Sequence, residues 1–393
     1  MNRIYMDNAA TTRVTQPVLE AMLPYLTDIF GNPSSVHGFG RDARRALDAA
    51  REQVANALGA KTNEIYFTGC GTESDNWAIR GAAYARKSKG NHIITSAIEH
   101  HAVLHTCEQL AKEGFDVTYL PVDEFGLVSA ESLEKAMRED TILVTVMTAN
   151  NEIGTIQPIA ELAKIAHDHG ALFHTDAVQA IGSIEFNVKD MGIDMLSLSG
   201  HKFHAPKGVG ALYIRSGLKI DRLIQGGAQE RTQRAGTENL ASIVGMGKAI
   251  EIAAANVKEH NEYLKNLRDH MINRILTEIP ATRLNGHATE RLPGNVNVSI
   301  RYIEGEALLL SLDIKGIAAS SGSACTSGSL DPSHVLLAIG LPHEIAHGSL
   351  RLSLSEDNTM EEVDFAVDTL KDIVNRLRDM SPLYADAVAN GEI

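Results

Sequence analysis

The 393-residue chain is predicted to fold as an α/β protein, with a large, mostly parallel sheet domain flanked by helices and a smaller α+β domain. Three observations predict this fold class. Short apolar runs rich in branched residues recur along the first half of the chain and are typical of buried strands. Stretches with apolar residues at helical spacing alternate with them, which favours parallel strands joined by helices. The length also exceeds what one hydrophobic core normally holds.

The expected elements follow in chain order. Strands of the large sheet are expected at residues 64–67, 92–95, 117–120, 142–146, 172–175, 195–198 and 211–214, and helices between them at 43–58, 102–112 and 159–169. A long Ala-rich and charged stretch from about 245 to 276 predicts a connecting helix. The second unit should contain strands at 296–300 and 350–354 and helices at 306–312, 333–339 and 360–377. We expect a large domain at 13–255 and a small domain formed by 1–12 and 256–393.

The net charge, the N-terminal sequence and the cysteine pattern each exclude some classes of function. The chain has 36 Lys and Arg against 50 Asp and Glu, a net charge of −14 that disfavours nucleic acid as a partner. Its start lacks a signal-peptide pattern, and no apolar stretch was expected to reach the ~20 residues that cross a bilayer. A cytoplasmic protein with no membrane partner is therefore expected. The three cysteines form no CxxC pair, so neither a disulfide framework nor a structural zinc site is indicated.

A lysine and an aspartate at successive strand ends suggest a cofactor site. Lys202 lies just beyond the strand that ends at Leu198, and Asp176 ends the strand before it, so both side chains can reach one crevice. A lysine amine can form a Schiff base with an aldehyde. A carboxylate can keep a pyridine nitrogen protonated, which pyridoxal phosphate (PLP) needs as an electron sink. Taken singly, a surface lysine and a helix-capping aspartate are the alternatives.

Two more positions fit such a cofactor. Gly71 and Thr72 lie where a strand passes through a glycine turn into a helix, and N–H groups at a helix start suit phosphate, although a simple cap is the alternative. His100 follows another strand and can stack on a ring or transfer protons, although a capping or surface histidine is the commoner outcome. The adjacent His100 and His101 cannot face one ion from one helix, so no resident metal is expected.

Cys325 stands out among the three thiols. The surrounding segment, 318–329, consists mainly of small polar residues and glycine, which predicts a mobile, solvent-reachable loop. Cys70 at a tight turn and Cys107 within a helix are more typical of small packing residues. Cys325 has no packing reason to be cysteine, and a thiolate there can reach a substrate and then an acceptor. An incidental exposed thiol is the alternative.

Together these motifs resemble the cysteine desulfurases of the NifS/IscS type, which are fold-type I PLP-dependent transferases related to class V aminotransferases. The resemblance covers nearly the whole chain. The matching segments are residues 7–12, 31–35, 71–74, 99–100, 150–154, 174–179, 200–202 and 234–237, and the Cys325 loop. Met6 stands where the family commonly has leucine, a volume-conserving change.

The resemblance implies a role for each residue of the site. Lys202 would hold PLP, Asp176 would pair with its pyridine nitrogen, and His100 would stack on the ring and shuttle protons. A homodimer is expected, because Thr237 would reach the phosphate of the neighbouring subunit. The remaining implied contacts are Gln179 to the ring hydroxyl, Gly71, Thr72, Ser199 and His201 at the phosphate, Asn151 beside the cofactor, and Asn151 and Arg351 at the substrate carboxylate.

The implied reaction converts L-cysteine to L-alanine. Free cysteine would displace Lys202 from the cofactor, and the Cys325 thiolate would attack the substrate sulfur. The persulfide left on Cys325 would pass to an iron–sulfur scaffold or another sulfur-acceptor protein, with transient contact to an iron–sulfur cluster. A selenocysteine lyase or a small amino-acid aminotransferase shares the fold and is the nearest alternative. A non-catalytic sulfur or metal scaffold is the alternative from another class.

Overall fold

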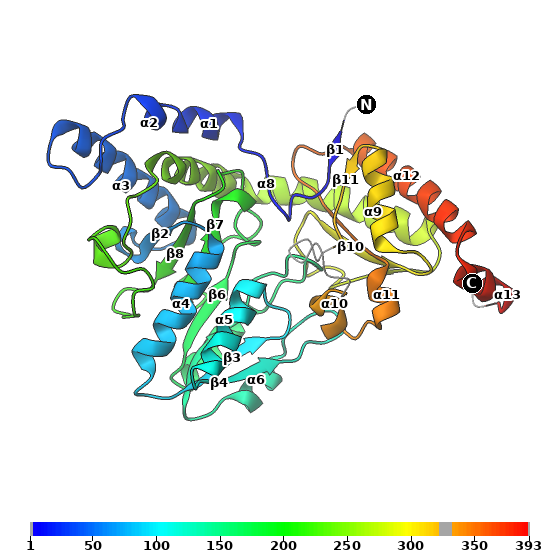
Figure 1. Ribbon diagram of the computed structural model, residues 1–393, viewed down its shortest axis with the longest axis horizontal. Helices are drawn as coiled ribbons and strands as arrows, with labels where there is room; N and C mark the ends of the chain where they lie inside the picture. Colours follow the sequence, from blue (N-terminus) through cyan, green and yellow to red (C-terminus); the bar gives the residue numbers. More distant parts are fainter. Residues whose placement is uncertain (1–2, 322–331, 392–393) are drawn as a thin grey trace.

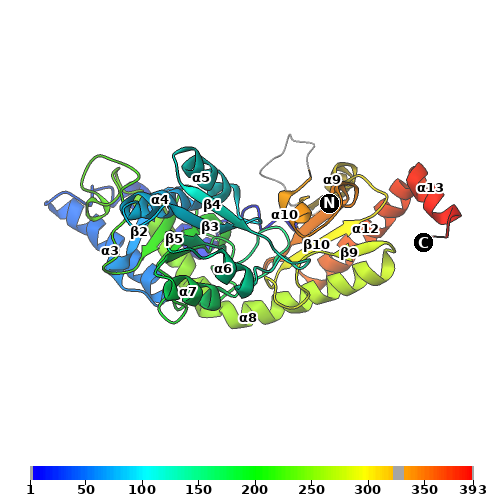
Figure 2. The same ribbon diagram turned by 90° about the horizontal axis from the view of Figure 1, so that it is seen from below.

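The computed structural model describes residues 3–321 and 332–391. Two parts of the chain, each with its own hydrophobic core, are joined along one long helix, α8 (Leu240–Glu278), which runs beneath both (Figures 1 and 2). Ile243 and Met246 of α8 pack in the core of the larger part, whereas Leu267 and Met271 pack in the core of the smaller one. At 1.5 Å per residue this helix is about 58 Å long.

The larger part is built on a seven-stranded sheet with the order β2-β8-β7-β6-β5-β3-β4. Neighbouring strands are parallel except at β8, which is antiparallel to both β2 and β7. Every expected strand of this sheet is confirmed to within one residue at each end. The strands are β2 (Ile65–Thr68), β3 (His92–Ser96), β4 (Asp116–Leu120), β5 (Thr141–Thr145), β6 (Leu172–Asp176), β7 (Met195–Ser199) and β8 (Gly210–Ile214).

Helices cover both faces of this sheet, which explains why β3, β5, β6, β7 and β8 are buried along their whole length. Successive strand residues point to opposite faces. Phe173 therefore packs with the helices of one face, while its neighbour Leu172 packs with those of the other. The first face carries α3 (Gly38–Leu58), α6 (Ala130–Ala136), α7 (Ile159–Asp168) and the first half of α8; the second carries α4 (Gly71–Arg86) and α5 (His101–Lys112).

The smaller part has a three-stranded antiparallel sheet with the order β12-β10-β9. The expected β10 (Asn295–Ile300), β12 (Ser349–Ser353), α9 (Gly305–Ile314), α10 (His334–Ala338) and α12 (Met360–Asp379) are confirmed. The short β1 (Ile4–Tyr5), β9 (Thr282–Leu284) and β11 (Ile317–Ala318) were not predicted, because two or three residues carry no periodic signal. Short helices complete the chain: α1 (Gln16–Met22), α2 (Pro24–Thr27), α11 (His343–His347) and α13 (Pro382–Ala389).

The N-terminal segment contributes to the second core although it precedes the first. β1 pairs with β11, and Ile4 and Met6 are buried among the apolar residues of the smaller part. The expected domain limits, 1–12 and 256–393 against 13–255, stay a prediction, and α8 crosses the limit at 255 without a break.

Helix α8 is long and apolar enough to cross a membrane by length and composition, so the expectation that no stretch would meet that test is wrong. Just over half of the apolar stretch, 56%, is buried within the fold, and α8 contacts α1, α3 and α12. These contacts are those of a core helix.

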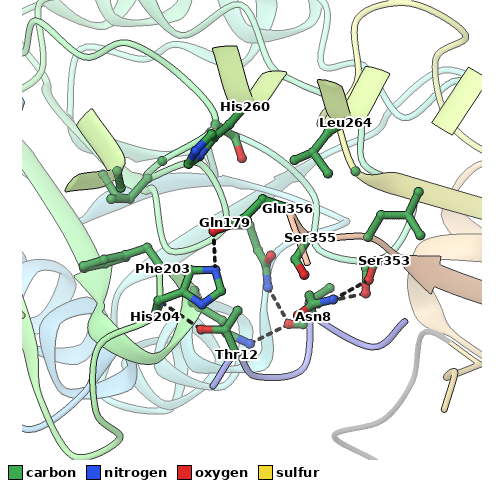
Figure 3. A pocket seen from close by; sticks show the side chains of 18 of the residues that line it. Asn8, Thr12, Gln179, Phe203, His204, His260, Leu264, Ser353, Ser355 and Glu356 are labelled. Atoms are coloured by element: carbon green, nitrogen blue, oxygen red, sulfur yellow. Dashed lines mark hydrogen bonds and ion pairs between the residues drawn. The ribbon is translucent and has the colours of Figure 1, made fainter. Parts of the chain in front are cut away.

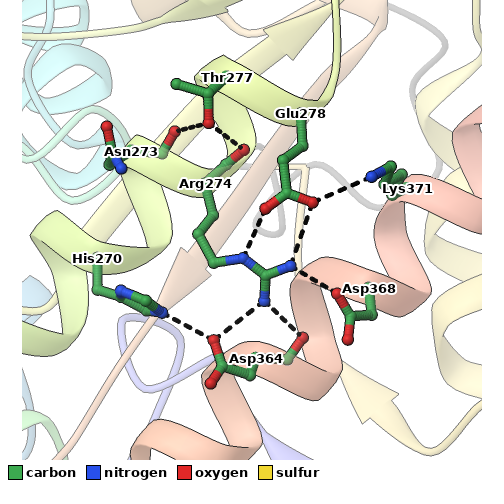
Figure 4. Close-up of polar contacts among 8 residues, drawn as sticks. All are labelled: His270, Asn273, Arg274, Thr277, Glu278, Asp364, Asp368 and Lys371. Atoms are coloured by element: carbon green, nitrogen blue, oxygen red, sulfur yellow. Dashed lines mark hydrogen bonds and ion pairs between the residues drawn. The ribbon is translucent and has the colours of Figure 1, made fainter.

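An ion-pair network fixes α12 to the second half of α8 (Figure 4). Arg274 of α8 donates to Asp364 Oδ1 at 3.0 Å and to Asp368 Oδ1 at 2.6 Å, both on α12, and to Glu278 one turn further along α8. Lys371 of α12 in turn donates to Glu278 Oε2 at 3.1 Å. The smaller part is therefore held on α8 by charge as well as by apolar packing.

Candidate active site

Asp176 and Lys202 lie at the same edge of the sheet, at the carboxyl ends of β6 and β7. Asp176 is the last residue of β6, and Lys202 ends the 3-10 turn η2 (Gly200–Lys202) that follows β7. Burial raises the pKa of Asp176 to about 6, while the Val178 N–H, which donates to Asp176 Oδ1 at 2.9 Å, and the Lys202 charge act in the opposite direction. The two groups are thus within electrostatic reach of each other.

His100 belongs to the same cluster. It caps the N-terminus of α5, where its Nδ1 accepts a hydrogen bond from Ala102 N at 3.1 Å, so the capping interpretation is correct for this nitrogen. Burial, and next the Lys202 charge, lower the pKa of His100 to about 4. The imidazole is therefore neutral at pH 7 and, with Nδ1 acting as acceptor, carries its proton on Nε2.

The glycine turn before α4 packs directly on the ends of β6 and β7. A Cβ on Gly71 would lie 2.7 Å from Val178 Cγ2 and 3.3 Å from Ser199 Cβ, so only glycine allows this close approach. Thr72 is exposed beside the turn, whereas Ser199 is buried. The start of a 16-residue helix next to a serine hydroxyl is a suitable cradle for phosphate.

A loop from further along the chain is tied to this turn. Arg234 donates to Glu73 Oε1 at 2.7 Å and Oε2 at 3.1 Å, and Glu73 Oε2 accepts from Gly69 N at 2.8 Å. Thr237 is exposed on the same loop, between η3 (Glu230–Thr232) and α8.

Residues 7–12, here called the N-terminal strap, pass over Lys202. The Lys202 Nζ donates to Ala9 O at 2.6 Å and to Ala10 O at 2.8 Å, and Gln179 Nε2 donates to Ala9 O at 2.8 Å. His201 Nδ1 lies 3.1 Å from Thr11 Oγ1. Sequence reasoning matched the strap only as a motif and missed these contacts, because backbone carbonyl acceptors leave no residue-type signal.

The strap also lines a cavity of about 130 Å³ between the two parts of the protein (Figure 3). Lys202, Gln179 and His204 lie on its larger-part side, with Ser353 and Glu356 on the smaller-part side. His204 Nε2 and Glu356 Oε1 form an ion pair at 3.1 Å across it.

Arg351 reaches the site from the smaller part. It lies on β12 with its side chain 2% exposed, and its Nη1 donates to Asn151 O at 3.0 Å in the loop after β5. The structure thus brings Arg351 and Asn151 together at the junction of the two parts, as the resemblance implies for a carboxylate site.

Cys325 lies outside the described residues. Cys107 is buried in the core beside α4 and α5, and burial raises the pKa of its thiol to about 12, so its packing role is confirmed. The same interpretation is wrong for Cys70, which is exposed at the N-cap of α4. Within residues 3–321 and 332–391, no group of three His, Cys, Asp or Glu is arranged to hold a metal ion.

Buried acids behind Asp176 were missed by the sequence reasoning. Burial raises the pKa of Glu99 to about 8, and burial followed by the Asp176 charge raises the pKa of Asp75 well above its usual range. Burial lowers the pKa of His174, whose Nε2 lies 3.8 Å from Asp75 Oδ1, to about 3. Burial thus favours the protonated forms of Asp75 and Glu99 and the neutral form of His174, whereas the Val178 N–H and the Lys202 charge favour the ionised form of Asp176.

An amine and a carboxylate at adjoining strand ends, a neutral imidazole and a phosphate cradle are the groups that a pyridine aldehyde phosphate requires. The residues present therefore fit PLP.

Comparisons with known proteins agree with this chemistry. The family described as Aminotransferase class-V matches residues 4–365. The chain is 61% identical over 380 residues to a protein named cysteine desulfurase IscS from Methanosarcina thermophila, covering 97% of this chain and 94% of that protein. It is 58% identical over 395 residues to a protein of the same name from Clostridium botulinum, covering all of both.

Solved structures are similar over nearly the same length. One described as a NifS-like protein has a TM-score of 0.90 and 42% identity, covering 95% of this chain and all of that one. Another, described as SspA in complex with cysteine, has a TM-score of 0.81 and 40% identity, covering 91% of this chain and all of that one.

Proposed function

The chain belongs to the aminotransferase class-V family and, within it, to the cysteine desulfurases, and on that premise we propose that it converts L-cysteine to L-alanine with PLP and passes the sulfur through Cys325. The observation that carries this proposal is the sequence identity of 58% and 61%, over nearly the whole chain, to proteins named cysteine desulfurase. The convergence of Lys202, Asp176 and His100 on one set of strand ends supports it independently.

When bound, PLP supplies an electron sink for negative charge at the substrate α-carbon. Lys202 would hold the cofactor through its aldehyde, and its Nζ, when free, would move a proton at the substrate α-carbon. The Asp176 carboxylate would keep the ring nitrogen protonated, and the neutral His100 would stack on the ring. The ring and phosphate would be held by Gln179, Gly71, Thr72, Ser199 and His201, with Asn151 beside them.

Arg351, with Asn151, orients the substrate through its carboxylate. The Cys325 thiolate attacks the substrate sulfur, so a sulfur–sulfur bond forms while the bond from Cβ to sulfur breaks. The carbon keeps the bonding electrons and takes a proton to give alanine. Cys325 is left as a persulfide. Its outer sulfur then passes by exchange to an acceptor thiol or an iron–sulfur scaffold, with transient contact between Cys325 and a cluster.

We further propose a cytoplasmic homodimer. The exposure of Thr237, on a loop that Arg234 ties to the phosphate turn, supports a contact from one subunit to the phosphate of the other. A size measurement by light scattering tests the dimer.

The test of the activity is a single turnover with L-cysteine on the yellow protein. Alanine together with a persulfide on Cys325 supports the proposal, whereas a keto acid with pyridoxamine phosphate identifies an aminotransferase. A colourless protein that contains zinc would identify the scaffold instead. Cys325→Ala should keep the yellow colour and lose turnover, and the matched control Cys70→Ser, at an exposed thiol, should keep both.

The cofactor anchor has its own test. Lys202→Ala should abolish the band that borohydride bleaches, and peptide mapping of the reduced wild-type protein should find PLP on Lys202. Trapping of the cofactor on another lysine would overturn the assignment.

A further inference from the structure

Asp7 lies against the arginine proposed to bind the substrate. Arg351 Nη2 donates to Asp7 Oδ1 at 2.9 Å, while Nη1 donates to Asn151 O at 3.0 Å. The Arg351 Nε is buried and has no hydrogen-bond partner among the described residues. A guanidinium has five N–H donors. Two are therefore committed to the protein, and a buried donor remains for a ligand.

The position of Asp7 is fixed by β12, the strand that carries Arg351. Ser353 N donates to Met6 O at 2.7 Å, and Asn8 N donates to Ser353 O at 3.3 Å. The Ser353 hydroxyl also accepts from Ala9 N at 2.8 Å. The Asn8 side chain adds a hydrogen bond from its Nδ2 to Ser353 O at 2.9 Å (Figure 3). Because both neighbours of Asp7 are hydrogen-bonded to the residue two positions after Arg351, carboxylate and guanidinium cannot shift independently.

The buried charge of Arg351 requires an oxygen partner such as the Asp7 carboxylate. A guanidinium that is 2% exposed is costly unless a carboxylate or carbonyl faces it. The other carboxyl near Arg351 is Glu152, which accepts a hydrogen bond from Ser333 Oγ at 2.5 Å, and burial raises its pKa. Asp7, at 20% exposure, is the carboxylate that forms the direct ion pair with Arg351.

We propose that Asp7 is a positioning residue for substrate selection, which holds the Arg351 guanidinium in one orientation so that Nε and the remaining donors meet the α-carboxylate of the incoming amino acid. This role rests on the proposed function and deepens it. Asp7 acts through Arg351, so its contribution is confined to ligands that carry a carboxylate.

The test compares two ligands of the yellow holoenzyme in a Cys325→Ala background, where cysteine binds without turnover. L-cysteine and cysteamine share the amine and the thiol, but cysteamine lacks the carboxylate. Binding is followed by the change in the cofactor absorbance. Asp7→Ala should weaken the binding of L-cysteine by about tenfold or more and leave the affinity for cysteamine within about twofold of the parent. Asp7→Asn, which keeps an oxygen acceptor at the same place, should recover most of the L-cysteine affinity.

Two further variants make the result decisive. Asp7→Glu keeps the charge but moves the oxygen by one methylene, so it should show the same selective loss even if Asp7→Ala does not fold. The control Asp357→Asn removes an exposed ion pair with Arg13 and should change neither ligand. Equal losses of affinity for both ligands would show that Asp7 has only a structural role. Unchanged or tighter binding of L-cysteine would show that Asp7 competes with the substrate carboxylate for Arg351. Failure of the Cys325→Ala parent to respond to L-cysteine would instead refute the proposed function.

Discussion

Removing Glu230 should strongly destabilise the larger part of the protein, because this carboxylate neutralises a buried arginine. Glu230 accepts from Arg51 Nη1 at 2.6 Å and Nη2 at 2.8 Å, and its Oε2 also accepts from Phe67 N at 3.0 Å. The side chains of Arg51 and Glu230 are 5% and 2% exposed. The pair thus connects α3, β2 and the loop that leads to Thr237.

The magnitude follows from what Glu230→Ala leaves behind. Arg51 Nη1 keeps its hydrogen bond to Ile65 O at 2.8 Å, but Nη2 loses the carboxylate oxygen that accepts from it. Breaking a buried ion pair from one side costs about 3–5 kcal/mol, and an unpaired buried amide such as that of Phe67 costs about 1–3 kcal/mol. Water entering the space left by the side chain offsets part of this sum. We therefore expect a loss of about 4 kcal/mol.

The single tryptophan of the chain makes the assay selective. Trp77 is 1% exposed in the larger part, and its Nε1 donates to Asp221 O at 3.1 Å, so its fluorescence reports on that part. Urea unfolding at pH 7 should show a markedly lower midpoint for Glu230→Ala. The control Asp48→Ala removes a solvent-exposed pair with Arg44 and should cost below about 1 kcal/mol. A Glu230→Ala midpoint that matches this control would refute the reasoning.

Three other perturbations have expected outcomes. Burial raises the pKa of Glu99 from 4.5 to about 8, so the folded protein holds an extra proton between these pH values and loses stability as the pH rises through them. Glu99→Gln, which resembles the neutral acid, should therefore flatten the decline in urea midpoint between about pH 5 and pH 9. Gly71→Ala would put its Cβ 2.7 Å from Val178 and should lower the PLP retained after dialysis, whereas Gly38→Ala, with 3.9 Å of clearance, should not. Arg274→Ala should increase amide hydrogen exchange where α12 meets α8, at a cost of about 1–2 kcal/mol.

The sheet was predictable because its strands are buried on both faces. In 172–175, neighbours such as Leu172 and Phe173 enter different cores, so apolar residues follow one another without alternation, which is typical of a strand buried on both faces. β9 was missed for the opposite reason: Thr282 and Leu284 are only partly buried and Arg283 is exposed, so no pattern of burial marks the strand. The apolar content of α8 was also underestimated, because the expected helix began at about 245 and so left out the apolar residues with which α8 starts.

Within the site, residue types at strand ends could be recognised, but their protonation could not. Asp176 and Lys202 were predicted because a carboxylate and an amine after successive strands have few structural purposes. Nothing in the sequence distinguishes Asp75 or Glu99 from a surface acid, since their raised pKa values come from burial and from neighbours that only the folded chain supplies. The sequence therefore did not reveal that two acids with raised pKa values, Asp75 and Glu99, lie within electrostatic reach of Asp176.

The strap explains why residues so distant in the chain must meet. Ala9 and Ala10 accept hydrogen bonds from Lys202 of the larger part, while Asp7 pairs with Arg351 of the smaller part. Under the proposed function, Lys202 bonded to the cofactor aldehyde would not donate in the way that the free ammonium does, so its hydrogen bonds to Ala9 O and Ala10 O would change during turnover. Since Asp7 is only two residues from Ala9 on the same hydrogen-bonded segment, the proposed binding of the substrate carboxylate by Arg351 and the proposed cofactor bond of Lys202 would act on one short piece of backbone. That segment would give cofactor chemistry in one part and substrate recognition in the other a direct physical connection.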